Sequence, residues 1–136
     1  MPIHEIALQN AILATAIDTD GSIFICSHSH GKKQSPSIGH YVTFTNKSLE
    51  WLNYLKGFNV NGKINPHGRK GMYILVVESK ISILELLKRV YPYLYIKKKQ
   101  AELMIFYLLG RNSGKSYSQE DYFMMEEMKS LNRGAR

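Results

Sequence analysis

The sequence has little of several features that would settle its class at once. Its single cysteine, Cys26, excludes an intramolecular disulfide framework and a zinc site built on cysteines. A reducing intracellular compartment is therefore expected, the cytoplasm or, for an organelle-encoded protein, the organelle interior. No window approaches the roughly 18 apolar residues that a membrane span needs, and the N-terminus has no secretory signal pattern. We therefore expect an unexported protein with no membrane span.

Acidic residues are almost missing from the middle of the chain. The 136 residues contain 18 Lys and Arg against 11 Asp and Glu, a net charge of +7, yet between Gly21 and Val77 the one acid is Glu50. The basic residues of this stretch are Lys32, Lys33, Lys47, Lys56, Lys63, Arg69 and Lys70. Such a balance indicates a polyanionic partner, with nucleic acid ahead of an acidic membrane surface because the segment is rich in strands rather than in an amphipathic helix.

Hydrophobic periodicity predicts the order helix, two strands, helix, two strands and further helices. The predicted strands cover 22–29, 37–45, 63–67 and 72–79, and the predicted helices cover 4–17, 48–56, 82–90, 97–109 and 118–131. Asn46 or Ser48 can cap the second helix, and Ser82 with Glu85, like Ser118 with Asp121, has capping-box spacing. This is an α+β domain whose four-stranded sheet has one face covered by helices and the other free.

The free face of the predicted sheet mixes hydrogen-bonding and apolar side chains. Strand alternation, together with the basic residues of the two hairpin turns, predicts a DNA-contacting set of Ser22, Phe24, Cys26, His28, His30, Lys32, Lys33, Ser37, Tyr41, Thr43, Lys63, Asn65, His67, Arg69, Lys70, Met72 and Ile74. A two-stranded ribbon fits a major groove, where base edges carry both kinds of feature. An ordinary solvated sheet face is the alternative.

Small residues form a stripe along the first predicted helix. Ala7, Ala11 and Thr15 are spaced four apart, with Ala14 beside them. Such a stripe allows a second helix to approach closely. Plain packing in the core of a single chain is the alternative reading.

Two aspartates, Asp18 and Asp20, follow this helix and precede Gly21. The C-terminus of a helix already carries roughly half a negative charge, so two carboxylates there need a divalent cation, a hydrogen-bonding cap or a positive group nearby. Carboxylate oxygens, water and phosphate oxygens are the ligands that Mg²⁺ prefers. A plain Asx-type turn into a strand is the alternative.

The run Leu13-Ala14-Thr15-Ala16-Ile17-Asp18-Thr19-Asp20-Gly21-Ser22-Ile23 closely resembles the signature of the LAGLIDADG homing endonucleases. Six positions match it, Leu13, Ala14, Ile17, Asp18, Asp20 and Gly21, and the three departures at Thr15, Ala16 and Thr19 spare both acids. The resemblance extends to an Asn46-Lys47 pair after the second strand and to a helix opening at 95–101. It implies an αββαββα endonuclease domain over residues 1–110, with 111–136 as a C-terminal helix and tail of the same domain.

The resemblance also implies roles for individual residues. Asp20, with Thr19 beside it, falls at the position that binds catalytic Mg²⁺ or Mn²⁺, and Asp18 at the helix junction. Asn46 takes the place of a polar residue, often Gln, that holds metal-bound water. Lys97 takes the place of a basic residue that assists at the scissile phosphate, with Lys98 as its nearest rival.

A single acidic motif implies that the active form is a homodimer. The chain has no second Asp-x-Asp-Gly, so cutting both strands of a duplex needs two copies, paired through Ala7, Ala11, Ala14 and Thr15 of the first helix. The expected target is a long pseudo-palindromic DNA site, and the expected role is that of an intron- or intein-associated homing endonuclease. A catalytically silent nucleic-acid-binding protein, such as an RNA maturase that aids splicing, is the alternative.

Overall fold

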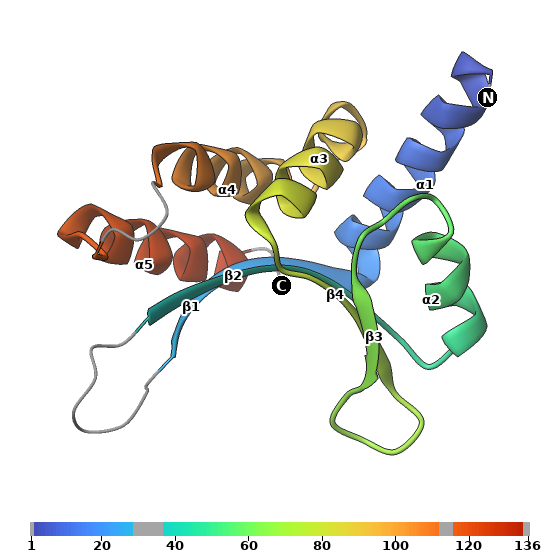
Figure 1. Ribbon diagram of the computed structural model, residues 1–136, viewed down its shortest axis with the longest axis horizontal. Coiled ribbons are helices and arrows are strands. Elements are labelled where there is room, and N and C mark those ends of the chain that lie inside the picture. The colour runs from blue at the N-terminus through green and yellow to red at the C-terminus, as the bar shows by residue number, and fades with distance from the viewer. Residues whose placement is uncertain (1, 29–36, 112–115, 135–136) are drawn as a thin grey trace.

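The computed structural model describes residues 2–28, 37–111 and 116–134 and confirms the predicted order of helices and strands (Figure 1). The elements are α1 (Ile3–Asp20), β1 (Gly21–His28), β2 (Ser37–Asn46), α2 (Leu49–Lys56), β3 (Lys63–Pro66), β4 (Tyr73–Val77), α3 (Lys80–Val90), the 3-10 turn η1 (Tyr91–Tyr93), α4 (Lys98–Gly110) and α5 (Gln119–Gly134). The fold is therefore α+β, with the αββαββα order and a C-terminal helix added.

The four strands form one arched sheet. Their order is β1-β2-β4-β3, and every neighbouring pair is antiparallel. Helices α3, α4 and α5 lie over the convex face, and both hairpins bend away from them, so the opposite face is concave and uncovered (Figure 1). The arch therefore leaves one face of the sheet open to a partner.

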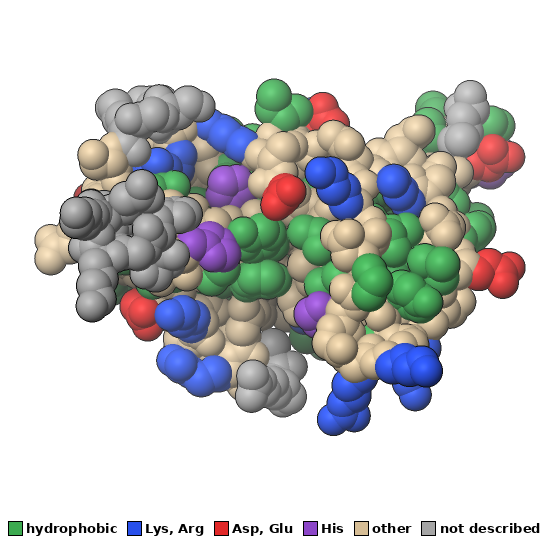
Figure 2. Space-filling model, turned by 60° about the horizontal axis from the view of Figure 1, so that its bottom comes forward, with side chains coloured by type: hydrophobic (Ala, Val, Ile, Leu, Met, Phe, Trp, Pro, Cys, Tyr) green, Lys and Arg blue, Asp and Glu red, His purple; other side chains and the backbone are tan. Residues whose placement is uncertain are grey.

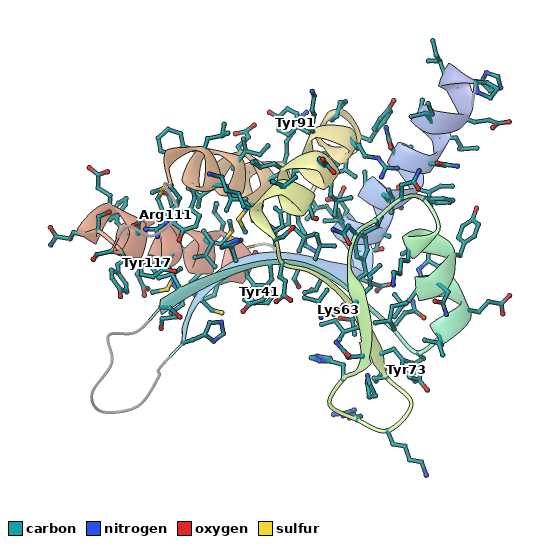
Figure 3. The ribbon with its side chains drawn as sticks, viewed as in Figure 1. Tyr41, Lys63, Tyr73, Tyr91, Arg111 and Tyr117 are labelled. Carbon is teal, nitrogen blue, oxygen red and sulfur yellow. The ribbon has the colours of Figure 1, made fainter. Side chains whose placement is uncertain are left out.

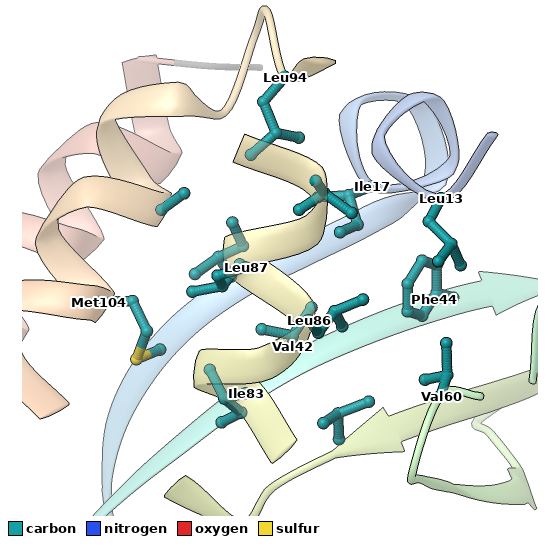
Figure 4. Close-up of a cluster of buried hydrophobic side chains, with 14 of the residues drawn as sticks. Leu13, Ile17, Val42, Phe44, Val60, Ile83, Leu86, Leu87, Leu94 and Met104 are labelled. Atoms are coloured by element: carbon teal, nitrogen blue, oxygen red, sulfur yellow. The ribbon is translucent and has the colours of Figure 1, made fainter. Parts of the chain in front are cut away.

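The core lies between the convex face and the helices. Alternate strand residues such as Ile23, Val42 and Leu75 are at most 1% exposed, as the period of two requires. They pack with Leu13 and Ile17 of α1, and a close-up of the cluster is given in Figure 4. Only the last turns of α1 are buried. Its first three turns project from the core, and Ile3 is 86% and Leu8 61% exposed.

The junction between α1 and β1 has no intervening turn, although the predicted helix ended at residue 17 and the predicted strand began at residue 22. The helix runs on to Asp20 and the strand begins at Gly21, whose φ of −101° is an ordinary extended value. A Cβ at Gly21 would lie 2.7 Å from the Cα of Ile17 and 2.8 Å from the carbonyl oxygen of Thr43. Glycine is thus needed here for close approach rather than for an unusual backbone angle.

Helix caps follow local sequence in three cases. Ser48 accepts a hydrogen bond from the Trp51 N–H (3.1 Å), and Ser118 and Asp121 form the predicted capping box. The start predicted for α3 at Ser82 is wrong, because Ser79 is the N-cap and accepts from the Ser82 N–H (3.2 Å). Ser82 instead accepts a hydrogen bond from Asn61 (2.8 Å) within the first turn.

Candidate active site and nucleic-acid interface

Asp18 and Asp20 have different surroundings although both end α1. The Asp18 carboxylate accepts hydrogen bonds from the backbone N–H groups of Tyr95 (2.8 Å) and Lys97 (2.9 Å), so it ties the end of α1 to the segment that opens α4. This matches the junction role expected of it. Asp20 is exposed, and no described residue donates a hydrogen bond to its carboxylate or forms an ion pair with it. Its oxygens are therefore available to a cation.

Lys97 brings a positive charge to this acidic end. It is the N-cap residue of α4, and its ammonium donates to the carbonyl oxygens of Ile17 (2.7 Å), Gly21 (2.5 Å) and Asp18 (3.4 Å). The Asp18 carbonyl belongs to the last turn of α1, where carbonyls lack an intrahelical partner, whereas the Ile17 carbonyl also accepts from the Gly21 N–H and Gly21 opens β1. Partial burial lowers the pKa of Lys97, while the negative charges of Asp18 and Asp20 oppose that change. The chain thus supplies both a cap and a positive group.

Lys98 does not join Lys97 at the acids. Its ammonium lies 4.8 Å from the ring centroid of Tyr91, whose hydroxyl donates to Glu102 (2.5 Å). Tyr91 lies on the helical side of the molecule, away from the concave face (Figure 3). Because successive residues at a helix start point in different directions, only one of the two lysines faces the α1 terminus. The structure brings Lys97 to the acids and not Lys98, contrary to the prediction that placed both there.

A hollow of about 550 Å³ lies beside Asp20. Asn46 lines it together with Thr19 and Trp51, so the structure brings Asn46 to the acid as predicted. The Asn46 side-chain oxygen accepts from the Ser48 N–H (2.8 Å), and Thr19 donates its hydroxyl to the Thr15 carbonyl (2.8 Å). The side-chain NH₂ group of Asn46 therefore remains able to donate a hydrogen bond into the hollow. Trp51 is half-buried and forms one wall of the hollow.

The exposed stripe of α1 differs from the predicted one at one position. Ala14 is fully buried in the core of its own chain, which corrects its assignment to a helix–helix interface. Ala7 and Ala11 are half-buried and Thr15 is exposed. The Thr15 hydroxyl donates to the Ala11 carbonyl (2.9 Å), which leaves the methyl group to face outwards.

The predicted DNA-contacting residues of the strands lie together on the concave face. Cross-strand pairs share a face, and the register pairs Ser22 with Thr43, Phe24 with Tyr41, His28 with Ser37, Lys63 with Val76 and Asn65 with Ile74. Figure 2 shows apolar side chains across the middle of this face with Lys and Arg near its margins. Arg69 and Lys70 lie exposed in the β3–β4 turn, and His67 and Met72 are joined by a backbone hydrogen bond (3.0 Å) at its base.

The interface prediction needs three adjustments. Thr43 lies on the concave face but is only 4% exposed, because it sits in the central strand β2 between Ser22 and Val76. Thr45 and Val76 share the face and were missed, although the same alternation would have found them. His30, Lys32 and Lys33 fall outside the described residues.

Three further observations concern the described residues. Burial raises the pKa of the Cys26 thiol, against the opposing charge of Lys129, so the unreactive thiol form is favoured. In the described ranges, no three His, Cys, Asp or Glu side chains gather as a metal site within one chain. No described helix is long and apolar enough to cross a membrane. Among the described residues, Asp20 is the carboxylate that lines the hollow.

Comparisons with known proteins rest on structure alone. No protein-family model matches the sequence, and no curated protein matches it significantly. The homing endonuclease I-CvuI, solved in complex with its target, is similar to the chain with a TM-score of 0.83 and 21% identity, over 94% of this chain and 84% of that one. The archaeal intron-encoded homing endonuclease I-Vdi141I, complexed with DNA, has a TM-score of 0.79 and 16% identity, over 91% and 84%.

A third structure is similar over a smaller share of its own length. The LAGLIDADG meganuclease I-AabMI, bound to uncleaved DNA, has a TM-score of 0.70 and 18% identity over 88% of this chain but only 43% of that one. The agreement of helix order, sheet and coverage with these neighbours confirms the predicted architecture. The chain has the fold of the LAGLIDADG homing endonucleases.

Proposed function

We propose that this chain is a site-specific endonuclease that cuts both strands of a DNA duplex as a homodimer. The observation that carries the proposal is the contrast between the two acids. Asp18 is committed to the α1–α4 junction, whereas Asp20 is exposed and unpaired among the described residues, next to an ammonium fixed by three carbonyl oxygens. The first arrangement serves the junction, whereas the second leaves a carboxylate open to a ligand.

The residues around Asp20 suit Mg²⁺ or Mn²⁺. The available donors are carboxylate and other oxygens, which hard divalent cations prefer, and such ions keep several waters and need few protein ligands. One chain offers one carboxylate, so Asp20 of a second copy would complete the site. Bound there, the cation would activate water and stabilise the charge that develops on the scissile phosphate.

The remaining groups have roles of their own. The Lys97 ammonium places positive charge where the phosphate gains negative charge, a contribution that a fixed donor makes without reorganisation. The Asn46 amide orients water or a phosphate oxygen in the hollow beside Asp20. The carboxylate of Asp18 acts only through Lys97, by holding its backbone.

Pairing of two chains is supported by the surface of α1. The helix projects from the core, and its exposed side is lined by Leu8, Ala11, Ile12 and Thr15, contiguous with the hollow that contains Asp20. The threonine hydroxyls are satisfied within the helix, so burying this stripe against a second copy leaves no unpaired donor. Two-fold pairing here would bring the two Asp20 side chains towards one another and would require a pseudo-palindromic target.

The test is cleavage of a duplex selected from a randomised library in the presence of Mg²⁺. Asp20→Asn is expected to abolish cutting while leaving duplex binding, measured in Ca²⁺, largely intact. Glu126→Gln serves as the matched control because it removes one carboxylate charge from an exposed position on α5. Cutting of unchanged rate by Asp20→Asn would overturn the proposal. No cutting by the natural sequence, together with tight RNA binding, would favour the maturase-like alternative.

A further inference from the structure

The concave face carries polar and apolar side chains on both hairpins, including exposed Ser22 and His28 on β1 and half-buried Ile74 and Val76 on β4. The β3–β4 hairpin presents the exposed polar side chains Lys63, Asn65 and His67. The β1–β2 hairpin presents Phe24, Cys26 and Tyr41, all half-buried and adjacent in the strand register. We call these three residues the apolar patch. Tyr41 lies on the concave side in Figure 3, on the opposite side of the sheet from Tyr91.

The polar atoms of the patch are already engaged. The Tyr41 hydroxyl shares a hydrogen bond with Nε2 of His28 (2.7 Å), and the Cys26 sulfur lies 3.7 Å from the same nitrogen. The Tyr41 ring is stacked on Phe24, with centroids 5.1 Å apart and an interplanar angle of 29°. The patch therefore presents the two rings and the sulfur as its surface, and its one hydroxyl is engaged by His28.

Gly39 makes this arrangement possible. It is the cross-strand partner of Cys26, and a Cβ there would lie 2.5 Å from Nε2 of His28 and 2.6 Å from the Tyr41 hydroxyl. The His28–Tyr41 pair thus closes over a glycine, where any side chain would displace it. The geometry is fixed before any ligand binds, which reduces the ordering cost of recognition.

Apolar surface has one match among the base edges of a major groove, the 5-methyl group of thymine. The other major-groove features are hydrogen-bond donors and acceptors, which the apolar patch would desolvate without replacement. We propose that the apolar patch is a specificity-determining element that selects thymine by its methyl group. This inference rests on the proposed function, because it needs the concave face to lie in the major groove.

The position of the methyl group follows from the strand. Phe24 is four residues beyond Asp20, and a strand rises about 3.3 Å per residue, so the patch begins about 13 Å from the acid. For a strand that runs along the axis of B-DNA, at about 3.4 Å per base pair, this separation corresponds to a thymine about four base pairs from the cut in each half-site. The exposed polar side chains of the β3–β4 hairpin then read a separate part of the half-site.

The experiment replaces single thymines by deoxyuridine, which lacks only the methyl group. Duplexes carrying a library-selected target are made with one replacement per half-site at each thymine in turn, and binding is measured in Ca²⁺. Loss of one buried methyl contact, about 0.8 kcal/mol, corresponds to about fourfold weaker binding per half-site at the contacted position, and to little change elsewhere. The Phe24→Ala variant should bind the duplex with thymine and the duplex with deoxyuridine at that position with the same affinity.

Lys63→Ala is the matched control, because it should weaken binding to both duplexes by the same factor and keep the preference for thymine. Gly39→Ala should reduce the preference as Phe24→Ala does, since it displaces the His28–Tyr41 pair. Binding that is indifferent to deoxyuridine at every position overturns this inference alone. Failure to bind any duplex overturns the proposed function and this inference with it. Melting curves of each variant identify loss of fold as a separate cause.

Discussion

Replacement of Lys97 by methionine removes the ammonium that joins α4 to the end of α1 while keeping a side chain of similar length. The carbonyl oxygens of Ile17, Asp18 and Gly21 lose the Lys97 donor, although that of Ile17 keeps the Gly21 N–H. A cation at a helix C-terminus contributes up to about 2 kcal/mol when partly buried, and unsatisfied acceptors add to its loss. We expect a loss of about 1–2 kcal/mol, or a fall in Tm of roughly 3–10 °C for a domain of this size.

The effect on cutting should exceed the effect on stability. Loss of one preorganised positive group at the developing charge costs about 10²–10³ in rate. The assay is single-turnover cleavage of the selected duplex at a temperature where thermal melting shows the variant folded. Lys98→Met is the matched control, because its ammonium lies over Tyr91 and an exposed contact of that kind is worth only about 0.5–1 kcal/mol.

The pH dependence of cutting provides a second readout. Burial lowers the pKa of Lys97 below its ordinary value of 10.5, so the ammonium is lost earlier as the pH rises. Cutting should therefore decline on the alkaline side at a pH below 10.5. Lys97→Arg should recover part of the rate and shift this decline to higher pH, because the guanidinium stays protonated. If Lys98→Met lost cutting and Lys97→Met retained it, the assignment of the two lysines would be refuted.

Three other predictions concern pairing, pH and salt. Ala11→Glu should convert a dimer to a monomer in sedimentation velocity and abolish double-strand cutting, whereas Ile81→Glu, at a site 70% exposed on α3, should do neither. Burial lowers the pKa of His40, helped by the charges of Arg111 and Lys80 and opposed by Glu78. The folded state therefore disfavours the imidazolium, so stability should fall as the pH drops below about 6.5, and His40→Gln should flatten this trend in denaturation from pH 5 to 8. Lys63→Ala should lower the slope of log affinity against log salt by about 1 at every target sequence, and an unchanged slope would exclude a phosphate contact.

The parts of the fold that sequence predicted well have local causes. Strand alternation with a period of two placed Phe24, Tyr41 and Asn65 on one face, and the register confirms it. The Ser118–Asp121 capping box needs only residues three apart, and its two hydrogen bonds are present. Patterns of this kind depend on neighbours in the chain, so no tertiary knowledge is required.

The errors concern choices that only packing decides. Ala14 and Ala11 are equally small, and nothing in composition says which of them faces the core. Lys97 and Lys98 are identical side chains, separated only by the direction in which the start of α4 points them. Ser79 and Ser82 can both cap a helix, and the end of β4 at Val77 favours the first.

The different surroundings of the two acids explain why Asp20, and not Asp18, is open to a ligand. A carboxylate at a helix C-terminus is unfavourable unless donors reach it, and Asp18 obtains two backbone donors because the chain returns there before α4. The same return delivers Lys97 to the helix carbonyls, so the terminus is neutralised without the help of Asp20. Asp20 is two residues further on, beyond reach of the two backbone donors that hold Asp18. Its charge is therefore left for whatever binds in the hollow.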